Sequence, residues 1–172
     1  MIIDLAQIEG TSRGFDFTVS AEDLGLEESN VKFLSEINAS GDVQKQIAQV
    51  SVTGRITAHA EIDCTRCLKP VEQSLEIDFS VSFVTPEHFA VDKEREVGGE
   101  DLDTDVIDAD HLDLKDVVRE QILLNLPAQL FCRPDCKGLC PECGADRNLI
   151  DCDCDLNRAD PRWAALKNLN LD

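Results

Sequence analysis

The sequence predicts an α+β protein in which one helix packs on an antiparallel β-sheet, either open or barrel-like. A C-terminal cysteine-rich zinc-binding segment and a short terminal helix follow. Three observations predict this. Apolar and polar residues alternate with a period of two in two long stretches of the first half. One amphipathic stretch follows them, and six of the eight cysteines lie between Cys132 and Cys154. We expect residues 1–126 to form the β domain and residues 127–172 the zinc-binding segment.

The elements before the long strands are short. We expect strands at residues 1–8, 15–19 and 31–37, a loop at 21–30, and a turn at 38–42. The strands rest on alternating apolar residues. The turn is predicted from Asn38, Ser40, Gly41 and Asp42, which are residues that tight turns favour.

A long hairpin is the strongest strand prediction. Every even position from Val50 to Ile62 is apolar or glycine, and the odd positions are polar. The stretch from Leu75 to Phe83 repeats the alternation, so one face of the pair is buried and the other is wet. Gly54 interrupts the apolar series and predicts a bulge or bend. His59 falls among the polar positions, which favours a solvated surface residue over a metal ligand.

An acidic loop and one helix follow the hairpin. Residues 85–112 lose the alternation, and eight carboxylates with one lysine lie between Glu100 and Asp116. We expect a solvated loop there. Residues 113–126 predict a helix that Asp113 caps and Pro127 ends. Its apolar stripe, which should pack on the sheet, consists of Leu114, Val117, Val118, Ile122 and Leu124.

The cysteine spacing predicts structural Zn²⁺. Cys140 and Cys143 lie in a CPxCG sequence typical of a zinc knuckle, which supplies two thiolates of a tetrahedral site. We expect about one zinc ion per chain, held by four of the six clustered cysteines: Cys132, Cys136, Cys140, Cys143, Cys152 and Cys154. Cys64 and Cys67, at the tip of the long hairpin, form a weaker second half-site. The alternative is a set of disulfides or free thiols.

The expected compartment and the net charge limit the classes of binding partner. The opening MIIDLAQIEG does not resemble a secretory signal and no apolar run is long enough to span a bilayer, so we expect a cytoplasmic protein without a membrane partner. The net charge of −19 opposes tight binding to naked RNA and favours a basic protein partner. The sequence contains no phosphate-binding loop and no GxSxG or HExxH motif, which argues against an enzyme with a small-molecule substrate.

A partner surface is expected at two places. Asp160 and Pro161 begin a last short helix, in which Arg162 and Trp163 offer a cation and an aromatic anchor. The hairpin tip offers Arg66, with Leu68 beside it. In the alternative interpretation, Trp163 simply pins the helix to the core and Arg66 pairs with a carboxylate of the acidic loop.

Taken together, the motifs resemble a family. CTRCLKP at the hairpin tip, CRPDCKGLCPECGADRN and DPRWAALKNL occur in the same order as in the YceD-type large ribosomal RNA accumulation proteins. The resemblance covers roughly residues 45–172. It implies a non-enzymatic factor that supports accumulation of 23S ribosomal RNA and large-subunit assembly, with a ribosomal protein or a pre-50S particle as partner. Cys64, Arg66, Cys67 and Leu68 match the more widespread part of the family's motif.

Two other functions compete with this interpretation. One is a zinc–thiolate regulatory protein that responds to oxidation and binds a basic protein partner, which exposed thiolates would favour. The other is a nucleic-acid-binding ribbon, which the acidic charge disfavours.

Overall fold

The structure is a computed structural model that describes residues 1–8, 12–26, 31–46, 49–84, 104–107, 111–154 and 162. The chain forms two compact units. The sheet unit comprises Met1–Ile62 and Val71–Ala128, and the cysteine unit comprises Asp63–Pro70 and Gln129–Asp172. The tip of the long hairpin therefore belongs with the cysteine-rich segment, although 58 residues of the sheet unit separate them in sequence.

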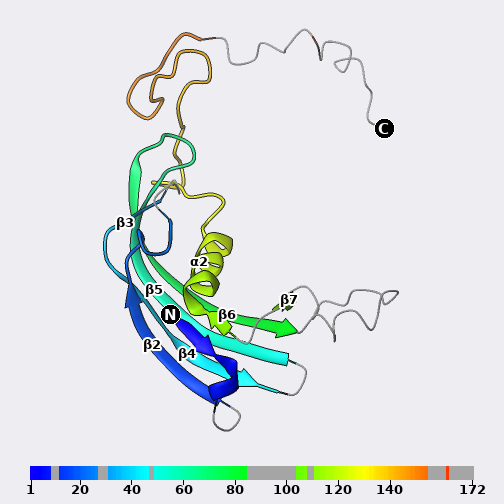
Figure 1. Ribbon diagram of the computed structural model, residues 1–172. Coiled ribbons are helices and arrows are strands. Elements are labelled where there is room, and N and C mark those ends of the chain that lie inside the picture. The colour runs from blue at the N-terminus through cyan, green and yellow to red at the C-terminus, as the bar shows by residue number, and fades with distance from the viewer. Residues whose placement is uncertain are drawn as a thin grey trace. The chain divides into compact units, whose positions relative to one another are not determined.

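Over its described residues, the sheet unit contains two sheets and one α-helix (Figure 1). The strands are β1 (Ile2–Asp4), β2 (Ser12–Val19), β3 (Val31–Phe33), β4 (Ile37–Lys45), β5 (Gln49–Asp63), β6 (Pro70–Val84), β7 (Thr104–Val106) and β8 (His111–Asp113). The helices are the 3-10 helix η1 (Leu5–Gln7) and the α-helix α2 (Leu114–Asn125). The larger sheet has the order β2-β4-β5-β6-β7, with β3 also paired to β5, and β1 pairs with β8.

Both sheets are open over the described residues, so the barrel-like alternative is wrong. The α+β class and the single packing helix are confirmed. The sheet is also not purely antiparallel, because β7 runs parallel to β6. A parallel neighbour needs a long crossover, and about 20 residues lie between these two strands in the sequence.

The long hairpin matches its prediction closely. Within β5 the even positions Val52, Ile56 and Ala60 are fully buried, and the odd positions of this strand are half-buried or exposed. In β6 the buried residues are Leu75, Ile77, Phe79 and Phe83, whereas Val81 is half-buried. The same alternation in two neighbouring strands places all of these side chains on one face of the sheet.

In this region the predicted turn and the predicted bulge are wrong. Residues 38–42 are not a turn but the middle of β4, where the side chains of Ala39 and Val43 are buried and the polar residues face outward. Gly54 does not form a bulge, because the register of β4 with β5 is continuous. A Cβ at Gly54 would lie 2.6 Å from the Ser40 carbonyl oxygen and 3.0 Å from the Phe79 ring, so glycine serves close packing there.

The predicted acidic loop, residues 85–112, lies mostly outside the described residues. The parts described include β7 and most of β8, so the expectation of an unbroken loop was wrong. The predicted terminal helix also lies outside the described residues, apart from Arg162, which is exposed.

Helix α2 forms where the sequence predicts. The Asp113 carboxylate accepts a hydrogen bond from the Lys115 N–H (2.9 Å) and from the α-amino group of Met1 (3.0 Å), which caps the helix. Its buried residues are Leu114, Val117, Val118 and Ile122, and Figure 1 shows the helix lying across β5 and β6. Leu124 was wrongly included in the packing stripe, because its side chain is 76% exposed.

No helix in the described part of the chain combines the length and the apolar character that crossing a membrane requires.

Candidate metal centres

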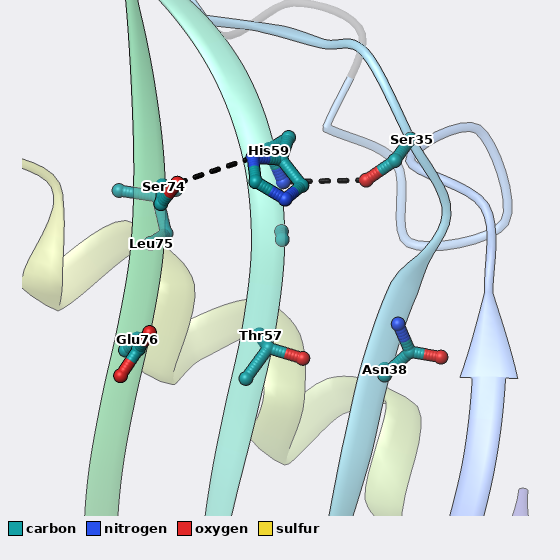
Figure 2. Close-up of a pocket in the computed structure, with 8 residues that line it drawn as sticks. Ser35, Asn38, Thr57, His59, Ser74, Leu75 and Glu76 are labelled. Atoms are coloured by element: carbon teal, nitrogen blue, oxygen red, sulfur yellow. Dashed lines mark hydrogen bonds between the residues drawn. The ribbon is translucent and has the colours of Figure 1, made fainter.

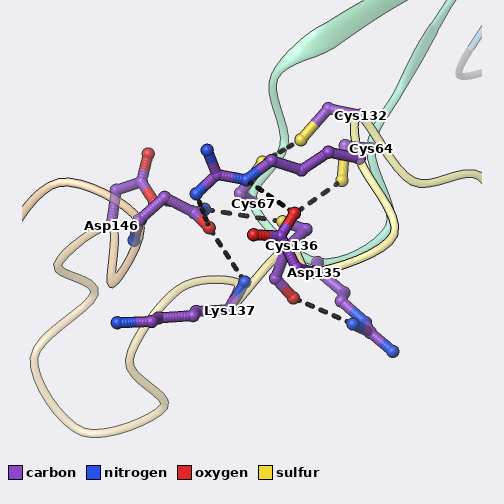
Figure 3. A network of polar contacts seen from close by, with 10 residues as sticks. Cys64, Cys67, Cys132, Asp135, Cys136, Lys137 and Asp146 are labelled. Atoms are coloured by element: carbon purple, nitrogen blue, oxygen red, sulfur yellow. Dashed lines mark hydrogen bonds and ion pairs between the residues drawn. The ribbon is translucent and has the colours of Figure 1, made fainter.

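The eight cysteines lie in two groups of four within the cysteine unit. The first tetrad is Cys64, Cys67, Cys132 and Cys136, and the second is Cys140, Cys143, Cys152 and Cys154. The sulfur atoms within each tetrad all lie within 4.8 Å of one another. Figure 3 shows the first tetrad, whose members come from the hairpin tip and from the segment that follows the sheet unit.

The sulfur spacing suits a tetrahedral metal ion. Zinc–sulfur bonds of about 2.3 Å in a tetrahedron place the sulfurs about 3.8 Å apart. In the first tetrad the Sγ atoms of Cys64 and Cys136 are 3.9 Å apart, and those of Cys67 and Cys132 are 3.6 Å apart. Both pairs of sulfur atoms therefore lie at the spacing of zinc ligands, and these four cysteines form no disulfide.

The pairing resolves what the sequence leaves open. The structure places the Cys152/Cys154 pair beside the Cys140/Cys143 knuckle. The Cys132/Cys136 pair lies instead beside the hairpin tip, 65 residues away from Cys67 in sequence. Cys64 and Cys67 at the hairpin tip therefore belong to a complete tetrad, as the clustered cysteines do.

The hairpin tip has the backbone of a zinc knuckle. In the second tetrad the Gly144 N–H donates to the Cys140 carbonyl (2.8 Å), and the Cys140 N–H donates to the carbonyl five residues on (2.8 Å). At the hairpin tip the Leu68 N–H donates to the Cys64 carbonyl (2.9 Å), and the Cys64 N–H donates to the carbonyl five residues on (2.8 Å). The last residue of each turn has a positive φ, which is 74° at Gly144 and 57° at Leu68. A leucine at the glycine position hides this second knuckle in the sequence.

Hydrogen-bond donors lower the pKa of Cys64 and Cys136 in the first tetrad and of Cys140 in the second. Burial opposes ionisation of Cys64, but N–H groups of Cys132, Arg66 and Cys67 outweigh it and lower the pKa of the Cys64 thiol to about 6. The Cys143 N–H likewise lowers the pKa of Cys140 to about 6.

Four thiols resist ionisation and have a raised pKa: Cys67, Cys132, Cys152 and Cys154. Hydrogen bonds with the sulfurs of Cys143 and Cys140 raise the pKa of Cys154 to about 12. Four thiolates so close together repel one another, and a divalent cation between them removes that penalty. The donor set therefore fits a thiophilic divalent metal.

Arg66 is part of the framework of the first tetrad. Its guanidinium lies 4.2 Å from the centre of the Phe131 ring and donates to the Cys136 carbonyl (2.9 Å). Its own carbonyl accepts from the Leu139 N–H (2.8 Å). Gly138 packs against it: a Cβ at Gly138 would lie 2.8 Å from the Arg66 carbonyl oxygen. The described contacts of Arg66 thus lie within the cysteine unit, and most of the acidic loop of the alternative interpretation lies outside the described residues.

Sequence reasoning missed Asn148, which touches the first tetrad. Its side-chain N–H donates to the Cys136 Sγ at 3.5 Å. The CGADRN sequence that contains it carries no motif of its own, since an asparagine in a loop has many uses.

The two tetrads differ in exposure. Cys64, Cys67 and Cys136 are buried and Cys132 is exposed. In the second tetrad only Cys140 is buried, while Cys152 and Cys154 are half-buried and Cys143 is exposed. Solvent and small oxidants therefore reach the second set of sulfurs more easily.

The residues expected at a partner surface are found in different situations. Leu68 is 60% exposed in spite of its strained backbone, and Arg162 is exposed. Trp163 lies outside the described residues, so the structure does not describe a surface that joins it to Arg66.

A depression on the sheet unit contains a contact between a histidine and a serine. The Nδ1 atom of His59 lies 3.2 Å from the Ser74 Oγ, and the His59 N–H donates to the Ser35 Oγ (3.2 Å), as Figure 2 shows. His59 is exposed on the open face of the sheet, as predicted. The residues that line the depression include one carboxylate, that of Glu76, and no bond joins it to the imidazole among the described contacts.

Comparison with known proteins adds the family. The chain is 31% identical over 169 residues to the uncharacterized protein YlbN of Bacillus subtilis, which covers 98% of this chain and 94% of the relative. It is 36% identical over 117 residues to the uncharacterized protein Rv2926c of Mycobacterium tuberculosis, covering 68% of this chain and 54% of that relative. No solved structure matches the chain.

A third relative carries a functional name. The chain is 25% identical over 170 residues to a chloroplast protein of Zea mays named large ribosomal RNA subunit accumulation protein YCED homolog 1, covering 81% of this chain and 57% of that protein. A family model described as large ribosomal RNA subunit accumulation protein YceD matches residues 52–170, which include every cysteine of both tetrads. The chain therefore belongs to the YceD family of large ribosomal RNA subunit accumulation proteins.

Proposed function

We propose that this protein is a non-enzymatic factor that supports the accumulation of large-subunit ribosomal RNA, and that each cysteine tetrad holds one structural zinc ion. The observation that carries the proposal is the family match across residues 52–170, which spans both tetrads. The family's description supports the link to ribosomal RNA, and the two tetrads support the binding of metal.

Zinc is the metal that the site supports best. Four thiolates in a tetrahedron suit zinc and iron, and zinc adds rigidity without redox chemistry. Four protein ligands also leave no open position for a substrate or an activated water, which favours a structural role over catalysis. We expect two zinc ions per chain, one more than the sequence alone suggests.

The charge is divided unequally between the units, which bears on the partner. The sheet unit carries 26 acidic and 8 basic residues, whereas the cysteine unit carries 9 acidic and 8 basic ones. The acidic sheet unit repels a phosphate backbone and attracts a basic protein. We therefore propose a ribosomal protein, free or within a pre-50S particle, as the partner.

Leu68 is the contact residue that the geometry favours most within the proposed partner surface. An exposed leucine at a position with positive φ costs backbone strain and leaves apolar surface in water, so glycine would serve the turn itself better. A partner that covers the Leu68 side chain explains its presence there. Arg162 and Trp163 remain further candidates, and Arg66 supports the turn that presents Leu68.

The experiment is co-sedimentation with ribosomal particles in cells that carry the tagged full chain. We expect the protein with pre-50S particles, and we expect cells without it to contain less 23S ribosomal RNA. Leu68→Gly should weaken co-sedimentation while both zinc ions are retained, and Leu149→Gly, at another exposed leucine of the same unit, is the matched control. Normal ribosomal RNA levels in cells that lack the protein would contradict the proposal.

The second candidate function is a redox-responsive regulator that binds a basic partner. The exposure of Cys143 and the half-burial of Cys152 and Cys154 favour it. In this case peroxide should release the zinc ion of the second tetrad before that of the first, and particle binding should change at the same time. Binding that is indifferent to loss of this zinc would exclude regulation.

A further inference from the structure

We infer that Asn148 couples the two metal centres: it lies in the loop that the second tetrad closes and orients a sulfur of the first. This inference rests on the zinc ions of the proposed function and adds a positioning residue to them. Its consequence is that occupancy of the second tetrad raises the affinity of the first for zinc.

The place of Asn148 in the chain makes it part of the second centre. It lies between Cys143 and Cys152, so an ion in the second tetrad pins both ends of its loop. Within the loop the Asp146 side chain accepts the Asn148 N–H (2.9 Å), and the Asp146 carbonyl accepts from Leu149 (2.9 Å). The loop is thus a compact turn that carries Asn148 in a defined orientation.

The side chain of Asn148 makes four contacts that fix its amide. Its oxygen accepts from the Lys137 N–H (2.8 Å) and from the Arg133 guanidinium (2.8 Å). Its nitrogen donates to the Asp146 carboxylate (2.7 Å) and to the Cys136 Sγ (3.5 Å). A flipped amide would set its oxygen against a carboxylate and a thiolate, so only one orientation satisfies all four groups.

The contact with Cys136 is the one that matters for metal binding. Cys136 is 2% exposed, so water does not solvate its sulfur and the donors must come from the protein. An N–H that donates to a ligand sulfur stabilises the thiolate and fixes the direction of its lone pairs. Loss of an outer-shell partner of this kind typically lowers metal affinity by about 10-fold to 100-fold.

The coupling follows because the second tetrad closes the loop that contains Asn148, and Asn148 contacts a sulfur of the first tetrad. When the second tetrad loses its ion, the loop around Asn148 is no longer closed by a metal, and the donor to Cys136 is held less firmly. Linkage is reciprocal, so an ion in the first tetrad stabilises the loop of Arg133 and Lys137 and thereby the second centre. The ion pair of Lys69 with Asp146 (3.1 Å) acts in the same direction, although its lysine is exposed and the pair is weak.

The test uses the full chain and competition with a zinc chelator. Asn148→Ala should still bind two zinc ions but should release the ion of the first tetrad at a chelator concentration about 10-fold to 100-fold lower than the unsubstituted protein. Cadmium NMR, with one signal per tetrad, identifies the ion that leaves. The control is Arg147→Ala, because Arg147 contacts the loop through its main chain, with its N–H on the Gly138 carbonyl (3.0 Å).

Asn148→Asp sharpens the test. The carboxylate keeps the acceptors for Lys137 and Arg133 but places negative charge beside Asp146 and the Cys136 thiolate. We expect a greater loss from the first tetrad than with Asn148→Ala. An aspartate variant that matches the unsubstituted protein would overturn the assigned donor role.

A double-substitution cycle isolates the coupling. The chain with Cys152→Ser and Cys154→Ser retains only the first tetrad, and we expect it to hold that zinc more weakly than the unsubstituted protein does. Adding Asn148→Ala should then have little further effect, because the donor is already displaced. An undiminished effect of Asn148→Ala in that background would overturn the coupling. A protein that binds no zinc at either tetrad would instead refute the proposed metal centres on which the inference rests.

Discussion

Substituting Gly138 and Gly144 separately with alanine tests whether the knuckles depend on backbone conformation alone or also on close packing. Both glycines have a φ of 74°, a conformation that residues with a side chain adopt at a cost. Their surroundings differ. A Cβ at Gly144 would meet no atom within 4 Å, whereas one at Gly138 would lie 2.8 Å from the Arg66 carbonyl oxygen and 3.2 Å from the Arg66 Cβ.

The expected magnitudes follow from these differences. The left-handed conformation costs an L-residue roughly 1–2 kcal/mol. Alanine recovers about 0.4–1 kcal/mol through the lower entropy of its unfolded chain. Gly144→Ala should therefore cost about 1 kcal/mol, which is roughly fivefold in the zinc affinity of the second tetrad. Gly138→Ala adds the steric clash, about 1–3 kcal/mol more. The total of about 2–4 kcal/mol weakens the first tetrad by roughly 30-fold to almost a thousandfold.

The assay is chelator competition on the full chain, with the thermal unfolding of the sheet unit as a folding control. Gly144→Asn is the matched variant, because asparagine tolerates the left-handed region and should recover most of the loss. Gly138→Asn should recover little, since its Cβ meets the same carbonyl. Equal losses for the two alanine variants, or equal rescue by asparagine at both positions, would refute the packing argument.

Three further predictions concern the separate parts of the molecule. Cys143→Ser should lower the zinc content by one ion and leave the unfolding transition of the sheet unit unchanged by circular dichroism, because that unit has its own core; joint unfolding would contradict this. Asp113→Asn should destabilise the sheet unit at pH 7. N–H donors and the Met1 α-amino group outweigh burial and lower the pKa of the Asp113 carboxyl, so its ionised form favours folding and the difference from the asparagine variant should vanish as the pH falls through that lowered pKa. A pH-independent difference in denaturant titrations would exclude the charge effect. Naked 23S fragments should not shift in a gel at submicromolar protein and physiological salt, and a tight complex would reveal a basic face that the net charge conceals.

The sequence predicts the long hairpin and α2 well because each buries one face, and burial imposes a period that a single stretch of sequence records. It fails at β4, where Asn38 to Asp42 have the composition of a turn. Pairing with both β2 and β5 overrides that local preference, and the close approach at Gly54 favours small residues in this region.

The candidate metal site is predictable in its chemistry but not in its pairing. The clustered cysteines indicate metal binding through spacing alone, whereas the choice among their partners depends on how distant segments meet in space. Leu68 in place of glycine weakens the motif at the hairpin tip, so the first tetrad is underestimated. Asn148 is not recognisable at all, because its role exists only when its loop lies against Cys136.

The separation of the hairpin tip from the rest of the cysteine unit determines the order in which the protein is completed during synthesis. The second tetrad closes within a stretch of 15 residues, whereas Cys67 waits for Cys132, which is synthesised 65 residues later. Closing so long a loop costs roughly 4 kcal/mol in chain entropy if nothing shortens it. The four ligands of the first centre are present only once Cys136 has been synthesised, and a chain released before residue 132 carries an unpaired knuckle. The first tetrad can therefore bind zinc with all four ligands only in a chain that has been translated through Cys136.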